Sequence, residues 1–254
     1  MGSYLNPGNK GFQESLNSKI YVDKTGLIEK TNAALNTRQK FVCVSRPRRF
    51  GKSMAADMLA AYYARGEDSA ELFKSLKIRK AESYEKHRNQ YDVIKVNMQE
   101  FLSMTHSMDE MLSMLQKYLI FDLMDHFETV RFRDEHNLIQ VMKDIYSKTN
   151  HSFIILIDEW DCLFREYKQD KEAQKEYLDF LRAWLKDKDY VALAYMTGIL
   201  PIKKYGSHSA LNMFTEYSMT DPGDLAEYFG FTEKEVFALC EKYDMSFEEA
   251  KMWY

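Results

Sequence analysis

The feature that most constrains the fold of this chain is an unbroken run of five apolar residues, Phe153-Ile154-Ile155-Leu156-Ile157. A strand with one face in water alternates apolar and polar residues, but this run contains no polar position. We therefore predict a strand that is buried on both faces. Such strands occur where helices cover both sides of a parallel sheet.

The rest of the chain alternates between predicted strands and predicted helices. Four further strands are expected at residues 41–45, 93–98, 191–196 and 214–219. Helices are expected from residue 24, directly after residue 52, and at residues 107–128, 135–147 and 170–186. Because strands that alternate with helices form βαβ units, the sequence predicts an α/β fold with five strands in one parallel sheet.

The pattern changes near Thr220, where the last predicted strand is followed by short helices. These are expected at residues 225–229, 233–243 and 247–254. We predict two units, a core over residues 1–220 and a helical lid segment over residues 221–254. The final helix is still amphipathic at Tyr254, so the chain is expected to be a fragment of a longer protein.

Composition argues against several classes of protein. Hydrophobic residues make up 45% of the 254 residues and the net charge is −4, which is typical of a globular domain and favours neither nucleic acid nor a membrane surface as a partner. No run of 18 apolar residues is present, so no membrane span is predicted. Cys43, Cys162 and Cys240 are far apart and the N-terminus lacks a signal-peptide pattern, which predicts buried thiols and a cytoplasmic location.

A phosphate-binding loop is predicted between the strand at residues 41–45 and the next helix. The segment Arg46-Pro47-Arg48-Arg49-Phe50-Gly51-Lys52-Ser53 matches the last three positions of the pattern G-x-x-x-x-G-K-[ST]. Gly51 lets backbone N–H groups and the helix N-terminus face phosphate oxygens. Lys52 is expected to reach the β- and γ-phosphates, and Ser53 to ligate Mg²⁺. Arg46 replaces the first glycine of the pattern.

The residues around this lysine are expected to contact the nucleotide as well. Nucleotide contacts are predicted for Arg48, Arg49, Phe50, Gly51, Lys52, Ser53 and Met54. The two arginines have three open roles, which are to bind phosphate, to pair with Asp161 or Glu166, and to reach a neighbouring subunit.

Two acidic residues, Asp158 and Glu159, directly follow the apolar run. A buried parallel strand carries them to the edge of the sheet where the phosphate loop also lies. Asp158 is predicted to hold Mg²⁺ together with Ser53, and Glu159 to act as the general base that polarises the attacking water. Thr197 ends another strand and is a candidate sensor of the γ-phosphate; the alternative is a threonine that caps the following turn.

No arginine follows Arg182 in the sequence. An arginine that stabilises the transition state is therefore expected from earlier in the chain, from a C-terminal part that this chain lacks, or from a partner or second copy. Lys203-Lys204 and Ser207-His208-Ser209 form a polar loop that is predicted to be surface or a contact face.

Five motifs, in this order along nearly the whole chain, resemble the AAA-ATPase-like family of bacterial proteins. They are Tyr21-Val22-Asp23-Lys24-Thr25, the loop from Arg46 to Ser53, Asp158-Glu159-Trp160-Asp161, Thr197-Gly198-Ile199 and Ser209-Ala210-Leu211-Asn212. The family's own loop is R-P-R-R-F-G-K-S, which accounts for the missing first glycine. Trp160 departs slightly, because the family more often has tyrosine at this position.

The resemblance implies a three-layer P-loop NTPase sandwich with strand order 5-1-4-3-2, followed by a helical lid. It also implies that residues 21–25 lie near the nucleotide base, which adds Tyr21 and Asp23 to the predicted nucleotide contacts. Full-length members carry a C-terminal nuclease-like domain that is absent here, so nucleic acid is expected as a partner only through that domain.

These motifs favour Mg²⁺-dependent ATP hydrolysis that moves the lid and an effector region, with Lys52, Glu159 and Thr197 as catalytic residues. The guanine motif N-K-x-D is absent, which favours ATP over GTP. The alternative is a nucleotide-gated switch with negligible turnover. A small-molecule kinase would need an arginine-rich lid, which this chain lacks, and the net charge disfavours a pure nucleic-acid-binding protein.

Overall fold

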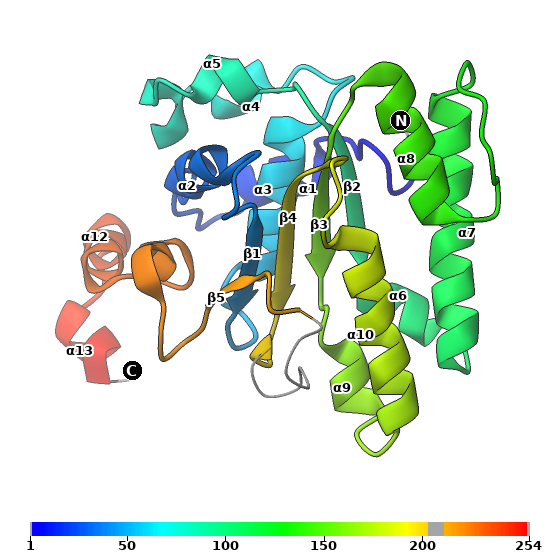
Figure 1. The fold of residues 1–254 in the computed structure, drawn as a ribbon. Helices are drawn as coiled ribbons and strands as arrows, with labels where there is room; N and C mark the ends of the chain where they lie inside the picture. The colour runs from blue at the N-terminus through cyan, green and yellow to red at the C-terminus, as the bar shows by residue number, and fades with distance from the viewer. Residues whose placement is uncertain (1, 203–210, 253–254) are drawn as a thin grey trace.

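The computed structural model describes residues 2–202 and 211–252, and its central element is one parallel sheet (Figure 1). The strands are β1 (Phe41–Ser45), β2 (Asp92–Asn97), β3 (Phe153–Asp158), β4 (Val191–Gly198) and β5 (Thr215–Tyr217). Their order is β2-β3-β4-β1-β5, and every neighbouring pair is parallel. This is the order 5-1-4-3-2 seen from the opposite edge, so the predicted sheet is confirmed.

The central strands β1, β3 and β4 are buried because both faces of the sheet are covered. Every residue of β1, β3 and β4 is buried. In β3, Phe153, Ile155 and Ile157 pack into one hydrophobic core. Ile154 and Leu156 pack into the core on the opposite face. Since side chains alternate between the faces of a strand, one apolar run contributes to two cores at once.

Helices close each core, and Figure 1 shows them on the two sides of the sheet. One core is closed by α1 (Lys10–Leu16), α2 (Gly26–Ala34), α3 (Lys52–Tyr63), α4 (Ala70–Phe73), η1 (Lys77–Lys80) and α5 (Tyr84–His87). The other is closed by α6 (Met98–Ser103), α7 (Met108–His126), α8 (Leu138–Thr149), α9 (Cys162–Glu166) and α10 (Lys171–Leu185). The predicted three-layer α/β sandwich of a P-loop NTPase is confirmed.

Capping side chains fix where several helices begin. The side chain of Ser107 accepts a hydrogen bond from the backbone N–H of Glu110 at the start of α7, and Asn137 accepts one from Gln140 at the start of α8. A cap satisfies an N–H that has no partner within the helix. The helix predicted from residue 135 therefore starts at Leu138, directly after its cap.

The segment after Thr220 consists of η2 (Gly223–Tyr228), α12 (Glu233–Tyr243) and α13 (Phe247–Met252), which Figure 1 shows in orange and red beside α2. Lys24 Nζ donates to the two carboxylate oxygens of Glu235 at 2.7 and 2.6 Å. The Tyr243 hydroxyl donates to the carbonyl oxygen of Lys19 at 2.6 Å. These helices are thus attached to residues 19–24, and the division of the chain near residue 220 stays a prediction.

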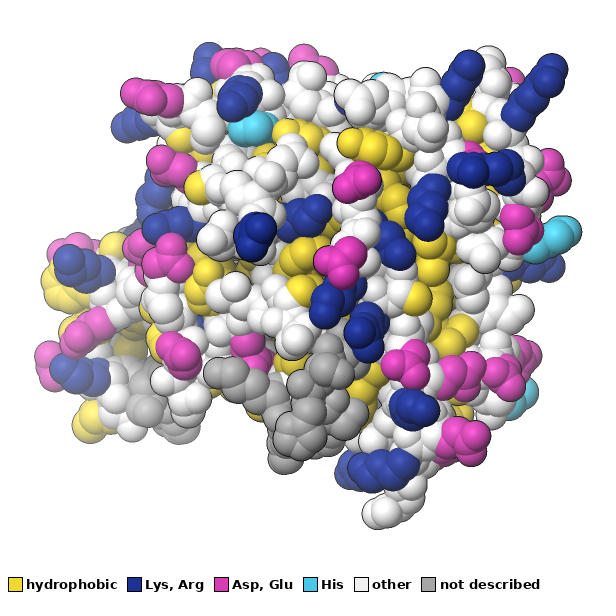
Figure 2. Space-filling view, in the orientation of Figure 1, with side chains coloured by type: hydrophobic (Ala, Val, Ile, Leu, Met, Phe, Trp, Pro, Cys, Tyr) yellow, Lys and Arg dark blue, Asp and Glu magenta, His cyan; other side chains and the backbone are white. Residues whose placement is uncertain are grey.

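The cysteines are buried, and the surface carries charged side chains of both signs. Cys43, Cys162 and Cys240 are free and buried, as predicted. On the face in Figure 2, acidic and basic side chains are interspersed. None of the helices in the described ranges has the length and apolar character needed to cross a bilayer. The predicted polar loop, from Lys203 to Ser209, lies outside the described residues, as does Ala210.

Candidate active site

The carboxyl ends of β1, β3 and β4 meet at one edge of the sheet because these strands run parallel. Ser45, at the end of β1, is level with Gly198, at the end of β4. The backbone N–H of Trp160, just beyond β3, donates to the carbonyl oxygen of Thr197 at 3.0 Å. The phosphate loop, the acidic pair and the sensor candidate therefore lie together, although they are far apart in sequence.

The loop between β1 and α3 turns through left-handed backbone conformations. Gly51, with φ 80°, is the N-cap of α3, and Arg49 has φ 71°. A Cβ built on Gly51 would meet no atom within 4 Å, so glycine is favoured for its backbone conformation rather than for space. The first turn of α3 carries no acidic residue, which leaves its N–H groups and dipole available to an anion.

The Lys52 side chain lies inside this loop, with only 5% of its surface exposed. Its Nζ donates to the carbonyl oxygens of Arg46 at 3.0 Å and Pro47 at 2.9 Å. Burial lowers the pKa of the Lys52 amine, and the carboxylates of Glu159 and Asp158 act against this shift. A lysine amine held within a loop of this shape is placed to bind the oxygens of a polyphosphate.

Three of the predicted site residues meet at the Asp158 carboxylate. Ser53 Oγ donates to Asp158 Oδ2 at 2.5 Å, and the Thr197 hydroxyl donates to Oδ1. The backbone N–H of Glu159 also donates to Oδ1, at 2.9 Å. Asp158 is 4% exposed, so these donors satisfy a carboxylate that water hardly reaches.

The oxygen atoms of Ser53 and Asp158 fit Mg²⁺. Mg²⁺ prefers oxygen ligands and, in phosphate-transfer proteins, is held by one or two protein groups together with the substrate phosphates. A full protein cage is not needed, and within residues 2–202 and 211–252 no group of three or more His, Cys, Asp or Glu could hold a metal ion. The two side chains belong to α3 and to the end of β3, and their contact places both oxygen donors where one ion could bind them.

Glu159 is held by an arginine that the sequence motifs did not single out. The Glu159 carboxylate pairs with the guanidinium of Arg165, which lies in α9. Only 22% of the Glu159 side chain and 17% of the Arg165 side chain are exposed. The signal that could have found Arg165 is its spacing of four from Asp161, because residues four apart lie on the same face of a helix.

Asp161 joins the turn after β3 to the turn after β4. Its Oδ2 accepts hydrogen bonds from the backbone N–H groups of Ile199 at 3.1 Å and Leu200 at 2.8 Å. The same oxygen lies 3.8 Å from Nε of Arg165. A Cβ on Gly198 would lie 2.8 Å from Asp161 Oδ1, so the close approach of the two turns requires glycine.

Arg46, at the position of the missing glycine, is buried and connects several elements. Its backbone N–H donates to the carbonyl oxygen of Gly198 at 3.0 Å. Its guanidinium donates to the carbonyl oxygen of Tyr217 in β5 at 3.0 Å and lies 5.8 Å from the centre of the Phe229 ring. Burial lowers the pKa of this guanidinium from its ordinary value. The side chain thus links the phosphate loop to the edge strand and to the C-terminal segment.

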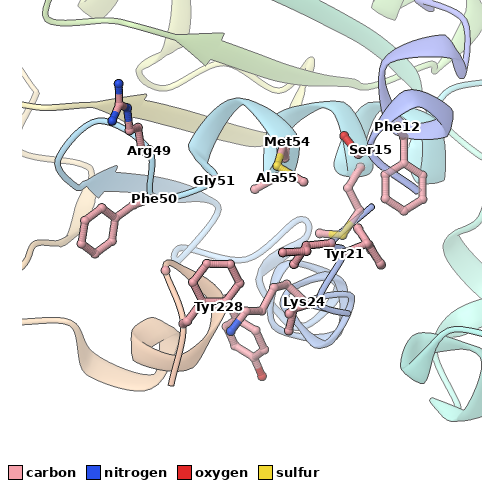
Figure 3. Close-up of a pocket in the computed structure, with 15 residues that line it drawn as sticks. Phe12, Ser15, Tyr21, Lys24, Arg49, Phe50, Gly51, Met54, Ala55 and Tyr228 are labelled. Carbon is pink, nitrogen blue, oxygen red and sulfur yellow. The ribbon is translucent and has the colours of Figure 1, made fainter. Parts of the chain in front are cut away.

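A cavity of about 150 Å³ opens beside Gly51 (Figure 3). It is lined by Tyr21 from the start of the chain, Phe50 and Met54 from the loop and α3, and Tyr228 from η2. Walls that are mostly apolar and aromatic suit a flat heterocyclic ring. Burial raises the pKa of the Tyr21 hydroxyl, so this wall stays uncharged.

Both arginines of the loop are exposed. Arg49 is among the residues that line the cavity beside Gly51, and Arg48 is not. The arginine beside Asp161 is Arg165, so the structure does not support the suggested pairing of Asp161 with the loop arginines. Their predicted contacts with phosphate or with a neighbouring subunit remain predictions.

Asp23 lies outside the lining of the cavity. Its carboxylate accepts hydrogen bonds from the backbone N–H groups of Thr25 at 2.9 Å and Lys77 at 2.7 Å. It therefore ties the segment that carries Tyr21 to the start of η1. A direct contact between Asp23 and the nucleotide remains a prediction.

Known proteins resemble this chain in sequence and in fold. The model of a family described as "Predicted AAA-ATPase" matches residues 9–207. An uncharacterized protein in the vnfD 5′ region of Azotobacter chroococcum mcd 1 is 24% identical over 245 residues, which cover 92% of this chain and 44% of the relative. The crystal structure of a DNA replication initiation factor aligns with a TM-score of 0.38 and 10% identity, over 91% of this chain and 55% of that one. This chain thus spans less than half the length of the Azotobacter relative.

Proposed function

The chain belongs to the predicted AAA-ATPase family, and on this basis we propose that it binds ATP with Mg²⁺ and hydrolyses it. Membership of this family indicates nucleotide binding of the ATPase type in general. The proposal goes further, because it assigns a metal, a reaction and a role to each residue of the site. We also propose that hydrolysis moves the C-terminal segment.

The observation that carries the proposal is the 2.5 Å hydrogen bond between Ser53 and Asp158. One residue follows the lysine of the phosphate loop and the other ends β3, a strand that is buried along its whole length. The two would hold Mg²⁺, which would neutralise negative charge on the phosphates. The helix N-terminus at Gly51 and the amine of Lys52 support the same assignment, since both attract phosphate.

The remaining catalytic roles belong to Lys52, Glu159 and Thr197. Lys52 would move from the loop carbonyls to the β- and γ-phosphates and hold them in line for attack. Glu159 would accept a proton from the water that attacks the γ-phosphorus, as the bond to the β–γ bridging oxygen breaks. Thr197, whose hydroxyl contacts Asp158, would report the state of the γ-phosphate to the loop that follows β4.

The cavity beside Gly51 is the proposed site of the adenine ring. Tyr21, Phe50 and Met54 would contact the base, and Arg49, which also lines the cavity, would bind a phosphate or the ribose. Arg48 is exposed and would bind phosphate from the open side or face a second subunit. Asp23 would act by holding the segment of Tyr21 in place.

The C-terminal segment is the proposed lid, so that residues 1–220 form the core and residues 221–254 the lid. Tyr228 and Gly230 line the same cavity as Tyr21, which means that this segment would touch a bound base. Binding and hydrolysis would then change how it packs on α2. We propose further that the motion acts on an effector region, that a partner supplies an arginine, and that nucleic acid binds through a further domain. The protein is proposed to act in the cytoplasm.

A nucleotide-gated switch with negligible turnover is the second candidate, and one observation favours it. One oxygen of the Glu159 carboxylate is paired with Arg165 and is therefore not available to an attacking water. A chain in which this pair persisted with nucleotide bound would hold ATP for long periods. Phosphate release in single turnover separates the two candidates, since a hydrolase releases phosphate and a switch does not.

The metal assignment is tested by titrating a fluorescent ATP analogue with Mg²⁺ and with EDTA. We expect Mg²⁺ to tighten binding to the wild type at least tenfold, because it joins two side chains to the phosphates. The variant Ser53→Ala is expected to lose most of this effect. Ser113→Ala removes a hydroxyl from the exposed face of α7 and serves as the control. Equal Mg²⁺ dependence in Ser53→Ala and the wild type would refute the assignment.

A further inference from the structure

The pair between Glu159 and Arg165 joins two residues of one short segment of the chain. Arg165 lies in α9, which begins one residue after Asp161, and the helix is fixed by the buried side chains of Cys162 and Leu163. The backbone of Glu159 is left-handed, with φ 53°, a conformation that the surroundings must stabilise. Local structure therefore places the guanidinium against the carboxylate.

Asp161 anchors the same arginine from the other side. Its carboxylate, which is 0% exposed, lies 3.8 Å from Nε of Arg165. Two backbone N–H groups, those of Ile199 and Leu200, hold this carboxylate in place. Both belong to the turn that directly follows the predicted sensor, Thr197. A chain of contacts thus leads from the sensor strand through Asp161 and Arg165 to Glu159.

The contact has a chemical consequence for Glu159. A carboxylate that is bound to a guanidinium has one oxygen occupied and its negative charge partly compensated. The oxygen that holds the guanidinium is not available to a water molecule, so the pair hinders the approach of an attacking water to Glu159. Glu159 and Arg165 are both largely shielded from water, so the pair is screened less than one on the open surface.

We propose that Arg165 is a positioning residue that restrains hydrolysis by holding Glu159, and that the turn after Thr197 controls the pair through Asp161. The inference rests on the proposed role of Glu159 as general base. Displacement of Ile199 and Leu200 by a nucleotide-bound neighbour or by the γ-phosphate would shift Asp161, loosen Arg165 and free the carboxylate. Hydrolysis is then slow until the turn after β4 moves.

The test compares steady-state ATP hydrolysis and ATP affinity in wild type, Arg165→Gln and Arg165→Lys. We expect Arg165→Gln to raise kcat about three- to tenfold and to leave ATP affinity within about twofold, because the arginine touches the base and not the nucleotide. Arg165→Lys keeps the charge but not the planar donor pair and is expected to lie between the two. Arg182→Gln removes the same charge from the exposed face of α10 and is the matched control.

The variant that links the effect to Glu159 is Glu159→Gln combined with Arg165→Gln. The double variant is expected to show no rise in kcat relative to Glu159→Gln alone. A rise that survives would place the effect of Arg165 elsewhere and overturn the inference. A kcat that falls or stays equal in both single Arg165 variants would also overturn it. The proposed function fails separately, if neither the wild type nor any Arg165 variant hydrolyses ATP.

Discussion

Arg46 departs from the general phosphate-loop pattern and has a structural role of its own. The residue occupies the position of a glycine in the general pattern, yet its side chain is 3% exposed and spans from the phosphate loop to Tyr217 and Phe229. The glycine that the phosphate loop does require is Gly51, whose φ of 80° is left-handed. The loop therefore keeps the glycine that shapes its backbone and uses the other position to anchor itself.

Restoring the pattern with Arg46→Gly is expected to destabilise the protein. The change leaves the carbonyl oxygen of Tyr217 without this charged donor and removes the contact with Phe229, which together cost about 1.5–3 kcal/mol. The free energy of unfolding in urea measures this loss. Arg48→Gly, at an exposed position of the same loop, is the control and is expected to cost less. Equal stability of Arg46→Gly and wild type would contradict this account.

At the residue scale, the sequence predicts those site residues that are marked by a distinctive local pattern. Lys52 and Ser53 follow a glycine between a strand and a helix, and Asp158 follows an apolar run, so each could be assigned from its neighbours. Arg165 has only its spacing of four from Asp161 as a signal, and this spacing does not reveal that its partner is Glu159, because that contact depends on the left-handed turn at Glu159 and on the packing of α9. Such pairs depend on backbone geometry that no short motif records.

At the scale of elements, β1, β3 and β4 were predictable because each is a largely apolar segment, whereas β2 contains Lys95 and β5 is only Thr215-Glu216-Tyr217. The helix α1 was not predictable, because only Phe12 and Ser15 of its seven residues are buried. The two core-facing positions are too few to set a helical period. The strand order came from the family resemblance rather than from periodicity, since an apolar run says that a strand is buried but not which strand lies beside it.

The attachment of α12 to the start of the chain depends on Lys24 and Glu235. Burial acts to raise the pKa of Glu235, but hydrogen bonds from Lys24 and from the backbone N–H of Thr232 outweigh it, so the pKa lies below its ordinary value. Because the pKa of Glu235 is lowered in the folded state, the pair stabilises the folded protein at pH values above the unfolded pKa of about 4.3. This stabilisation is lost as the pH falls through the lowered pKa.

Glu235→Gln tests this pair, because glutamine can keep the capping bond to Thr232 while the charge is removed. At pH 7 we expect the variant to be less stable than the wild type by about 0.5–1 kcal/mol. The difference should shrink as the pH falls below about 4. Unfolding in urea at a series of pH values measures it, with Glu241→Gln on the exposed side of α12 as the control. A difference that is independent of pH would contradict the assignment.

At the scale of the whole molecule, the fold explains why residues so far apart in sequence form one site. The sheet is parallel and buried on both faces, so every strand delivers its following loop to the same edge. The cavity beside Gly51 is completed by Tyr228 and Gly230, which sequence had assigned to a lid without placing them in the site. Those contacts depend on the way the two parts of the chain pack, which local patterns do not specify.

The central claim is that ATP binds at the phosphate loop of Gly51, Lys52 and Ser53 and is hydrolysed with the help of Glu159. The most direct measurement is calorimetric titration with ATP and Mg²⁺, followed by phosphate release, for wild type, Lys52→Ala and Glu159→Gln. We predict that the wild type binds and releases phosphate, that Lys52→Ala loses at least tenfold in affinity, and that Glu159→Gln binds normally but loses at least 100-fold in turnover, about what a general base contributes. A folded wild type that binds no nucleotide would contradict the account.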